Sequence, residues 1–167
     1  MNTTLTTPPK PRGLLEWAFH LPRYLYRWHL GWMLGHLCLM ITHVGRQTGC
    51  LRQTVLEVIH YDPTTQECIV MAGYGAQSDW YRNIQAQPAI EVQVGRQRYR
   101  PQQHLLSAEE TLHILEEYPR RHPWRFRVLL PLLARMAGYT YDGTPQGLRA
   151  ISEVMRGVEF RPEAAKK

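Results

Sequence analysis

The residues best suited to chemistry lie in a glycine-bracketed basic turn between two apolar segments. Within eight residues, from Gly45 to Arg52, the chain places two arginines, one threonine hydroxyl and two glycines. Gly45 and Gly49 can adopt positive φ or bring bare backbone close to a ligand, so successive N–H groups could point into one concavity. Arg46 and Arg52 would add charge-assisted hydrogen bonds to a phosphate or carboxylate, and Thr48 one more. The turn predicts an anion-binding site, with a solvated hairpin loop as the alternative.

A second candidate element is a glycine-rich loop that leads into a short helix. Gly73–Ala76 interrupts an apolar strand, and Ser78 is placed to cap a helix over Asp79–Ala86, which Pro88 ends. Such a loop at a helix N-terminus can bind an anion or support a flat ring. A tight turn needed only for chain topology would have the same sequence, so both interpretations stay open.

The overall composition fits one globular domain with an anionic partner. The chain has 167 residues, of which 44% are hydrophobic and 20% charged, which is enough for one sizeable core and too little for two. Lys and Arg outnumber Asp and Glu by 20 to 14, and the isoelectric point is about 9.5. This excess favours a phosphorylated cofactor, an anionic membrane surface or nucleic acid. Nucleic acid is least favoured, because the basic residues are scattered and form no recognised motif.

Cysteine and histidine spacing gives no indication of a metal centre. The three cysteines form no Cys-x-x-Cys pair, and the eight histidines form no His-x-x-x-His or His-Glu-x-x-His motif. We therefore expect no metal site, and the odd number of cysteines indicates a reducing, cytoplasmic setting. Residues 1–12 are rich in Thr and Pro and are expected to be a disordered tail, not a signal peptide.

Residues 13–34 have the apolar periodicity of a helix, which Pro22 would kink or divide. Arginines and tryptophans share this segment, among them Arg23, Arg27 and Trp28. A basic, aromatic face of this kind can lie in a lipid interface, so peripheral membrane contact is one expectation. The alternative is that the tryptophans cover the domain core while the arginines face water.

The rest of the chain predicts a mainly antiparallel sheet with helices at its margins. Alternating or apolar segments bounded by turn residues predict the strands, and capped segments with helical periodicity predict the helices. The strands are expected at 36–44, 53–61, 67–72, 89–94, 97–106 and 158–161, and the later helices at 107–121, 124–137 and 146–155. This order favours an α+β fold with a small barrel over a βαβ sheet. We expect one domain over 13–161, followed by a tail at 162–167.

Several short motifs together resemble the nitroreductase-family deazaflavin-dependent oxidoreductases. In chain order they are Leu-Pro-Arg-Tyr-Leu-Tyr at 21–26, Gly-Arg-Gln-Thr-Gly-Cys-Leu-Arg at 45–52, Val-Leu-Glu-Val at 55–58, Ser-Asp-Trp-Tyr-Arg-Asn-Ile at 78–84 and Gln-Pro at 87–88. The resemblance covers about residues 22–161, which is nearly the whole chain. It implies the split β-barrel of the flavin-binding, pyridoxamine-oxidase-like superfamily, and coenzyme F420 as the cofactor, with FMN as the alternative.

The resemblance also implies which residues hold the cofactor. In that family the glycine-arginine turn holds the phosphate-bearing tail of coenzyme F420, and the loop before the tryptophan lies along the deazaflavin ring. Transferred to this chain, the cofactor residues are Arg46, Gln47, Thr48, Gly49 and Arg52 in the turn, and Met71, Ala72, Gly73, Tyr74, Gly75, Ala76 and Trp80 in and beside the loop. Trp80 suits packing better than stacking on a ring. Tyr74 is the candidate proton donor, with Tyr139 and Tyr141 as further phenols.

The implied activity is hydride transfer from the reduced deazaflavin to an electron-poor small molecule such as a quinone, an enone or a nitro compound. Because the cofactor carries this chemistry, no catalytic triad or paired acid is needed in the sequence. A homodimer is expected from the same superfamily. The alternative is a non-catalytic split-barrel protein at a membrane surface that binds a fatty acid or other amphiphile, FMN or haem.

Overall fold

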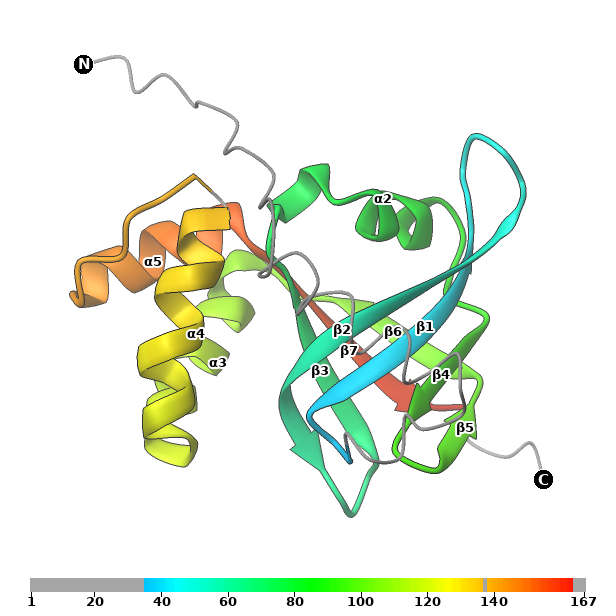
Figure 1. Ribbon diagram of the computed structural model, residues 1–167, viewed down its shortest axis with the longest axis horizontal. Coiled ribbons are helices and arrows are strands. Elements are labelled where there is room, and N and C mark those ends of the chain that lie inside the picture. Colours follow the sequence, from blue (N-terminus) through cyan, green and yellow to red (C-terminus); the bar gives the residue numbers. More distant parts are fainter. Residues whose placement is uncertain (1–34, 137, 164–167) are drawn as a thin grey trace, which may run out of the picture.

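The described part of the chain is a block of strands followed mainly by helices. The computed structural model describes residues 35–136 and 138–163. The strands are β1 (Cys38–Val44), β2 (Leu51–Asp62), β3 (Glu67–Ala72), β4 (Glu91–Val94), β5 (Gln97–Tyr99), β6 (Pro101–Leu105) and β7 (Arg156–Pro162). The helical segments are η2 (Gly75–Gln77), α2 (Asp79–Ala86), α3 (Ala108–Arg121), α4 (Pro123–Met136) and α5 (Pro145–Val154). Figure 1 shows α3, α4 and α5 grouped on one side of the strands and α2 at one end.

The strands form one antiparallel sheet of seven in the order β5-β4-β1-β2-β3-β7-β6. The strands at the two ends of this order, β5 and β6, are separated in the sequence only by Arg100. The sheet therefore curves back on itself, and the chain crosses from one margin to the other through a single residue. This arrangement confirms the predicted α+β fold with a mainly antiparallel split barrel and peripheral helices.

The interior of the barrel is one apolar cluster. Alternate residues of the strands build it, because successive side chains of a strand point to opposite faces. Its fully buried members include Leu39, Ile41, Val70, Val92, Val94, Val158 and Phe160. Helix α2 adds Tyr81 and Ile84 to the same cluster. The helix is thereby fixed to the end of the barrel by one apolar face.

A second apolar cluster joins the three later helices to the outer surface of the barrel. Ile59 of β2 and Met71 of β3 pack there with helical residues such as Leu115. The helix α3, expected at 107–121, begins with a capping box. The Ser107 hydroxyl accepts from the Glu110 amide at 3.2 Å, and the Glu110 carboxylate accepts from the Ser107 amide at 2.8 Å. Hydrogen bonding from Ser107, and from His104, lowers the pKa of Glu110 to about 2.

Two local predictions are wrong. The strand expected over 97–106 is divided at Arg100, because β5 pairs with β4 while β6 pairs with β7. Ser78 occupies the N-cap of α2, but its side chain makes no capping hydrogen bond. Its buried hydroxyl has no hydrogen-bond partner among the described residues. Helix α2 is therefore held in place by its packing and by the polar contacts described below.

Some predictions concern segments outside the described residues. These are the N-terminal tail at 1–12, the helix at 13–34 with its membrane contact, and the last four residues of the C-terminal tail. Within 35–136 and 138–163, no helix is long and apolar enough to cross a membrane. Over the same residues, no three His, Cys, Asp or Glu side chains come together in a way that could hold a metal ion.

Candidate functional site

The basic turn joins β1 to β2, and most of its backbone amides make hydrogen bonds within the protein. The amide of Gly45 donates to the carbonyl of Cys50 at 2.8 Å, and that of Gly49 donates to the carbonyl of Gly45 at 2.8 Å. The amide of Arg46 donates to the side-chain oxygen of Asn83 at 3.0 Å. The predicted concavity of unused N–H groups therefore does not form. An anion at this turn would be held by side chains instead.

A hollow of about 120 Å³ lies between the basic turn and α2. Polar side chains and one glycine line it: Gly45, Arg46, Gln47, Thr48, Arg52, Asp79 and Asn83. Four of the turn residues expected to hold the cofactor, namely Arg46, Gln47, Thr48 and Arg52, thus meet in one place. Gly49 is not part of the lining.

Arg46 is bound to α2 before any ligand arrives. Its guanidinium donates to Asp79 Oδ1 and to Asn83 Oδ1, both at 3.0 Å, and to the carbonyl of Asp79 at 3.4 Å. The carboxylate of Asp79 is 85% exposed, so this ion pair contributes only about 0–1 kcal/mol to stability. Its main effect is to fix the direction of the guanidinium.

Arg52 is the cation of the hollow that has no carboxylate partner in the part of the chain that the structure describes. Its Nε lies 2.9 Å, and Thr48 Oγ1 lies 2.8 Å, from the position that a Cβ on residue 45 would occupy. A side chain at Gly45 would collide with both donors. The glycine therefore allows a hydroxyl and a guanidinium to converge over bare backbone.

The floor of the hollow is a buried polar network. Asn83 is 4% exposed and His43 is 1% exposed. Asn83 Nδ2 lies 3.3 Å from His43 Nδ1, and His43 Nε2 lies 3.1 Å from Thr54 Oγ1. Burial is the main cause that lowers the pKa of His43 from its usual 6.5, and the charge of Arg52 adds to it, while a backbone hydrogen bond with Val44 opposes it. His43 is thus held neutral under a basic surface.

The glycine loop lies against the last turn of α5. Gly75 has a φ of +56°, and a Cβ there would collide with the carbonyl oxygen of Val154. Arg82 Nε donates to the carbonyl of Ala76 at 2.9 Å, which ties the loop to α2. Tyr74 is 44% exposed and Val154 is 39% exposed. The loop therefore presents backbone and one phenol to solvent beside an apolar side chain.

The other loop residues expected at the cofactor support it from beneath. Met71 belongs to the helical cluster and is 7% exposed, and Ala72 belongs to the barrel interior and is 0% exposed. Trp80 packs against the barrel interior and meets the ring of Tyr81 edge-on. Tyr139 and Tyr141 pack against the helical cluster. Among the three phenols proposed as proton donors, Tyr74 is the one on the glycine loop.

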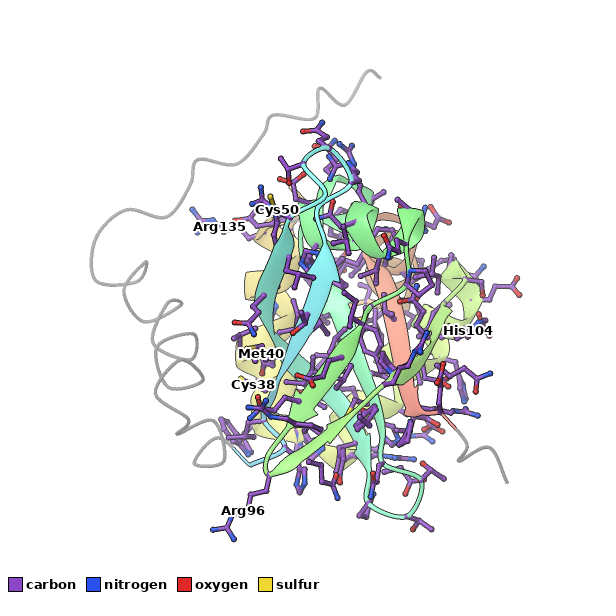
Figure 2. The ribbon with its side chains drawn as sticks, turned by 90° about the vertical axis from the view of Figure 1, so that its right-hand side faces the viewer. Cys38, Met40, Cys50, Arg96, His104 and Arg135 are labelled. Carbon is purple, nitrogen blue, oxygen red and sulfur yellow. The ribbon has the colours of Figure 1, made fainter. Side chains whose placement is uncertain are left out.

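Helix α2 is the element that brings the turn and the loop together. Asp79 and Asn83 are four residues apart, so they lie on one face and both bind Arg46. Figure 1 shows the β1–β2 turn, α2 and η2 at the same end of the molecule. In Figure 2, Cys50 marks this end and Arg96 the opposite end. From the sequence, no place in the binding site was assigned to Asp79, Asn83 or His43, although the spacing of the two α2 residues indicates a shared face.

The side chains of the hollow fit an anionic group such as a phosphate. Arg46 and Arg52 contribute two positive charges and Asp79 one negative charge, which leaves one net positive charge among the lining residues. Thr48 and Gln47 add neutral donors. A guanidinium, a hydroxyl and a primary amide around one hollow are the donors that a phosphate or carboxylate needs.

Comparison with known families gives one match that covers more than half of the chain. A family model described as F420H(2)-dependent quinone reductase matches residues 29–125. The match includes the basic turn, the glycine loop and α2. No curated protein matches the sequence.

Solved structures resemble the chain only distantly. A structure titled F420-H2 dependent reductase (FDR-A) has a TM-score of 0.48 at 16% identity, over 76% of this chain and 96% of that chain. A pyridoxamine 5'-phosphate oxidase-related, FMN-binding protein from Nostoc punctiforme has a TM-score of 0.46 at 19% identity, over 94% of this chain and 83% of that one. A third, titled a domain-swapped dimer, has a TM-score of 0.48 at 15% identity, over 89% and 99%. The fold assignment accordingly rests on the strand order itself.

Proposed function

Because this chain belongs to the F420H(2)-dependent quinone reductase family, and is therefore a deazaflavin-dependent reductase that uses coenzyme F420, we propose that the basic turn and the glycine loop hold that cofactor and that the acceptor is a quinone. The cofactor residues in this proposal are Arg46, Gln47, Thr48, Gly49 and Arg52 in the turn, and Gly73, Tyr74, Gly75 and Ala76 in the loop, with Met71, Ala72 and Trp80 supporting the loop.

The observation that carries the proposal is the position of Arg52 in the hollow. Its guanidinium has no carboxylate partner in the described residues and lies close to the hydroxyl of Thr48. The phosphate-bearing tail would be held by this pair of donors and by the N–H groups of Arg46 that α2 does not use. Arg46 is already fixed by Asp79 and Asn83, so little ordering is needed when the anion binds.

The glycine loop would orient the reactive end of the cofactor. When bound in its reduced form, coenzyme F420 supplies a hydride to the acceptor. Reduction of a quinone to a hydroquinone needs this hydride and one proton. The phenol of Tyr74 is exposed on the loop and is the proposed proton donor, to be reprotonated from water. Val154, beside Gly75, would give the acceptor an apolar contact that excludes water from one side.

Our proposals for the electron acceptor, the oligomeric state and the cellular location are the expectations drawn from the sequence. We propose a quinone before an enone or a nitro compound, because the matching family is described as quinone reductase. We also propose a cytoplasmic homodimer with one domain over 13–161 and peripheral membrane contact through 13–34. Light scattering of the purified chain measures whether it forms a homodimer, and vesicle co-sedimentation measures whether it binds membranes.

The test is a titration of the purified protein with oxidised coenzyme F420 and, in parallel, with FMN. We expect saturable binding of coenzyme F420 and weaker binding of FMN. Arg52→Ala should weaken coenzyme F420 binding about tenfold or more, because hydrogen bonds to charged groups contribute about 1.5–3 kcal/mol. Arg98→Ala is the matched control, because Arg98 is also an exposed arginine but lies on β5, outside the hollow.

Turnover then separates binding from chemistry. With reduced coenzyme F420 and a soluble quinone, Tyr74→Phe should lower kcat while the affinity for the cofactor stays within about twofold of the wild-type value. The assignment of the turn is refuted if Arg52→Ala and Arg98→Ala bind the cofactor equally well. The quinone is refuted as acceptor if an enone or a nitro compound is reduced and the quinone is not.

A further inference from the structure

The side chain of Asn83 makes hydrogen bonds to two parts of the site at once. Its Oδ1 accepts from the Arg46 amide and from Arg46 NH1, both at 3.0 Å. Its Nδ2 lies 3.3 Å from His43 Nδ1. We propose that Asn83 is a positioning residue, which sets both the place of the basic turn over α2 and the direction in which Arg46 meets an anion. This proposal rests on the proposed function and adds to it a residue that need not touch the cofactor.

The hydrogen-bond directions in this network are fixed by its donors. Both groups of Arg46 are donors, so the atom of Asn83 that faces them must be its oxygen. The amide nitrogen of Asn83 therefore faces His43 and donates to Nδ1, which must carry no proton. The ring proton then lies on Nε2 and is donated to Thr54 Oγ1 at 3.1 Å. Neutral His43 and an uncharged amide at residue 83 are thus required together.

The hydrogen bonds of the Arg46 guanidinium show which of its N–H donors stay available to a ligand. A guanidinium has five N–H donors. Arg46 uses two on NH1, toward Asn83 Oδ1 and the carbonyl of Asp79, and one on NH2, toward Asp79 Oδ1. Its Nε–H and one N–H of NH2 have no partner among the described residues and are available to a ligand in the hollow. Holding the turn and the guanidinium through one buried amide fixes the direction of these two donors.

Two charged groups of the described residues, Arg52 and Asp79, lie beside the network of Asn83, Arg46 and His43. Arg52 of β2 lies close enough for its charge to disfavour a proton on the ring. From α2, Asp79 is directed to Arg46, and the group that meets the ring is the amide of Asn83. A carboxylate at residue 83 would accept a hydrogen bond from a protonated Nδ1 and would cancel the charge of Arg46. Asn83→Asp, which keeps the shape of the side chain, should therefore change both ends of the network.

The experiment compares Asn83→Asp and Asn83→Ala with Gln85→Ala, a control at an exposed position of α2. The readouts are the pKa of the His43 ring by NMR, the NMR signal of the Arg46 Nε–H, and the dissociation constants for inorganic phosphate and oxidised coenzyme F420. We expect Asn83→Asp to raise the pKa of His43 above the wild-type value. We expect both Asn83 variants to weaken cofactor binding about tenfold or more and to shift the Arg46 signal, and Gln85→Ala to change none of these readouts.

The outcomes separate this proposal from the proposed function. If wild type binds no coenzyme F420, the proposed function fails, and the His43 and Arg46 signals still decide whether Asn83 positions them. The positioning role is overturned if both Asn83 variants keep the wild-type His43 pKa and Arg46 signal. It is also overturned if those signals change while cofactor affinity stays the same. Asn83→Asp answers the question even where Asn83→Ala fails to fold, because it leaves no cavity.

Discussion

Replacing Gly75 with alanine tests whether the glycine loop is held by its close approach to α5. Residue 75 has a φ of +56°, and a Cβ there would collide with the carbonyl oxygen of Val154. The left-handed conformation costs a non-glycine residue about 1–2 kcal/mol. Relieving the collision requires a shift of packed backbone, which costs about 1–3 kcal/mol more. Alanine also lowers the conformational entropy of the unfolded chain, which offsets about 0.4–1 kcal/mol of this destabilisation.

We therefore expect Gly75→Ala to lower the free energy of unfolding by about 1–5 kcal/mol. The matched control is Gly143→Ala, because Gly143 has a φ of +83° but nothing within 4 Å of an added Cβ. That variant should lose only about 1 kcal/mol, since the strain of positive φ acts without a collision. Urea unfolding of the two variants measures the difference. Equal losses would refute the close contact between the loop and α5, and unchanged coenzyme F420 affinity in Gly75→Ala would refute a role for this loop in binding.

Three further predictions concern the support of the site and the fold. The pKa of the buried His43 is lower than its usual value, so the unfolded chain binds a proton at His43 more readily than the folded chain does. Stability should fall as the pH drops below about 6.5, and the urea midpoint of His43→Gln should fall less between pH 7.5 and 5.5 than that of wild type. Gln103→Leu should cost about 1–3 kcal/mol in urea unfolding, because the Gln103 side chain accepts from the Ala89 amide and donates to the Ile84 carbonyl, each at 2.9 Å; no loss would contradict this bridge. Ser107→Ala should cost about 1 kcal/mol by removing the cap of α3, and Ser107→Asp should restore most of it, a pattern that thermal unfolding would show.

Much of the fold could be predicted because its strands and caps are local. The alternation of apolar residues before Gly95 and the capping box at Ser107 lie where the structure has β4 and the start of α3. The division of the expected strand at Arg100 could not be predicted in this way. The residues on both sides continue the same alternation, and only the pairing of β5 with β4 and of β6 with β7 separates them. Pairing between strands that are distant in the sequence does not change the local alternation of apolar and polar residues.

The site could be predicted in its residue types but not in its contacts. Arginine, threonine and glycine in one turn indicated an anion, and four of those residues do line one hollow. The sequence could not show that the amides of Gly45 and Arg46 are already used by Cys50 and Asn83. Nor could it show that Ser78 leaves its hydroxyl without a partner in the described chain. These outcomes depend on where α2 docks, which is set by packing across the barrel.

The place of β7 in the sheet has a consequence for the order of folding. It is the last strand of the described chain, yet it lies between β3 and β6 and pairs with both. Until the ribosome has synthesised β7, β3 lacks a neighbour along one edge and β6 lacks its only strand neighbour. Strands β1 to β5 can already pair with one another during this interval. The free edge of β3 and the unpaired β6 are the surfaces at which a nascent chain would need protection from aggregation.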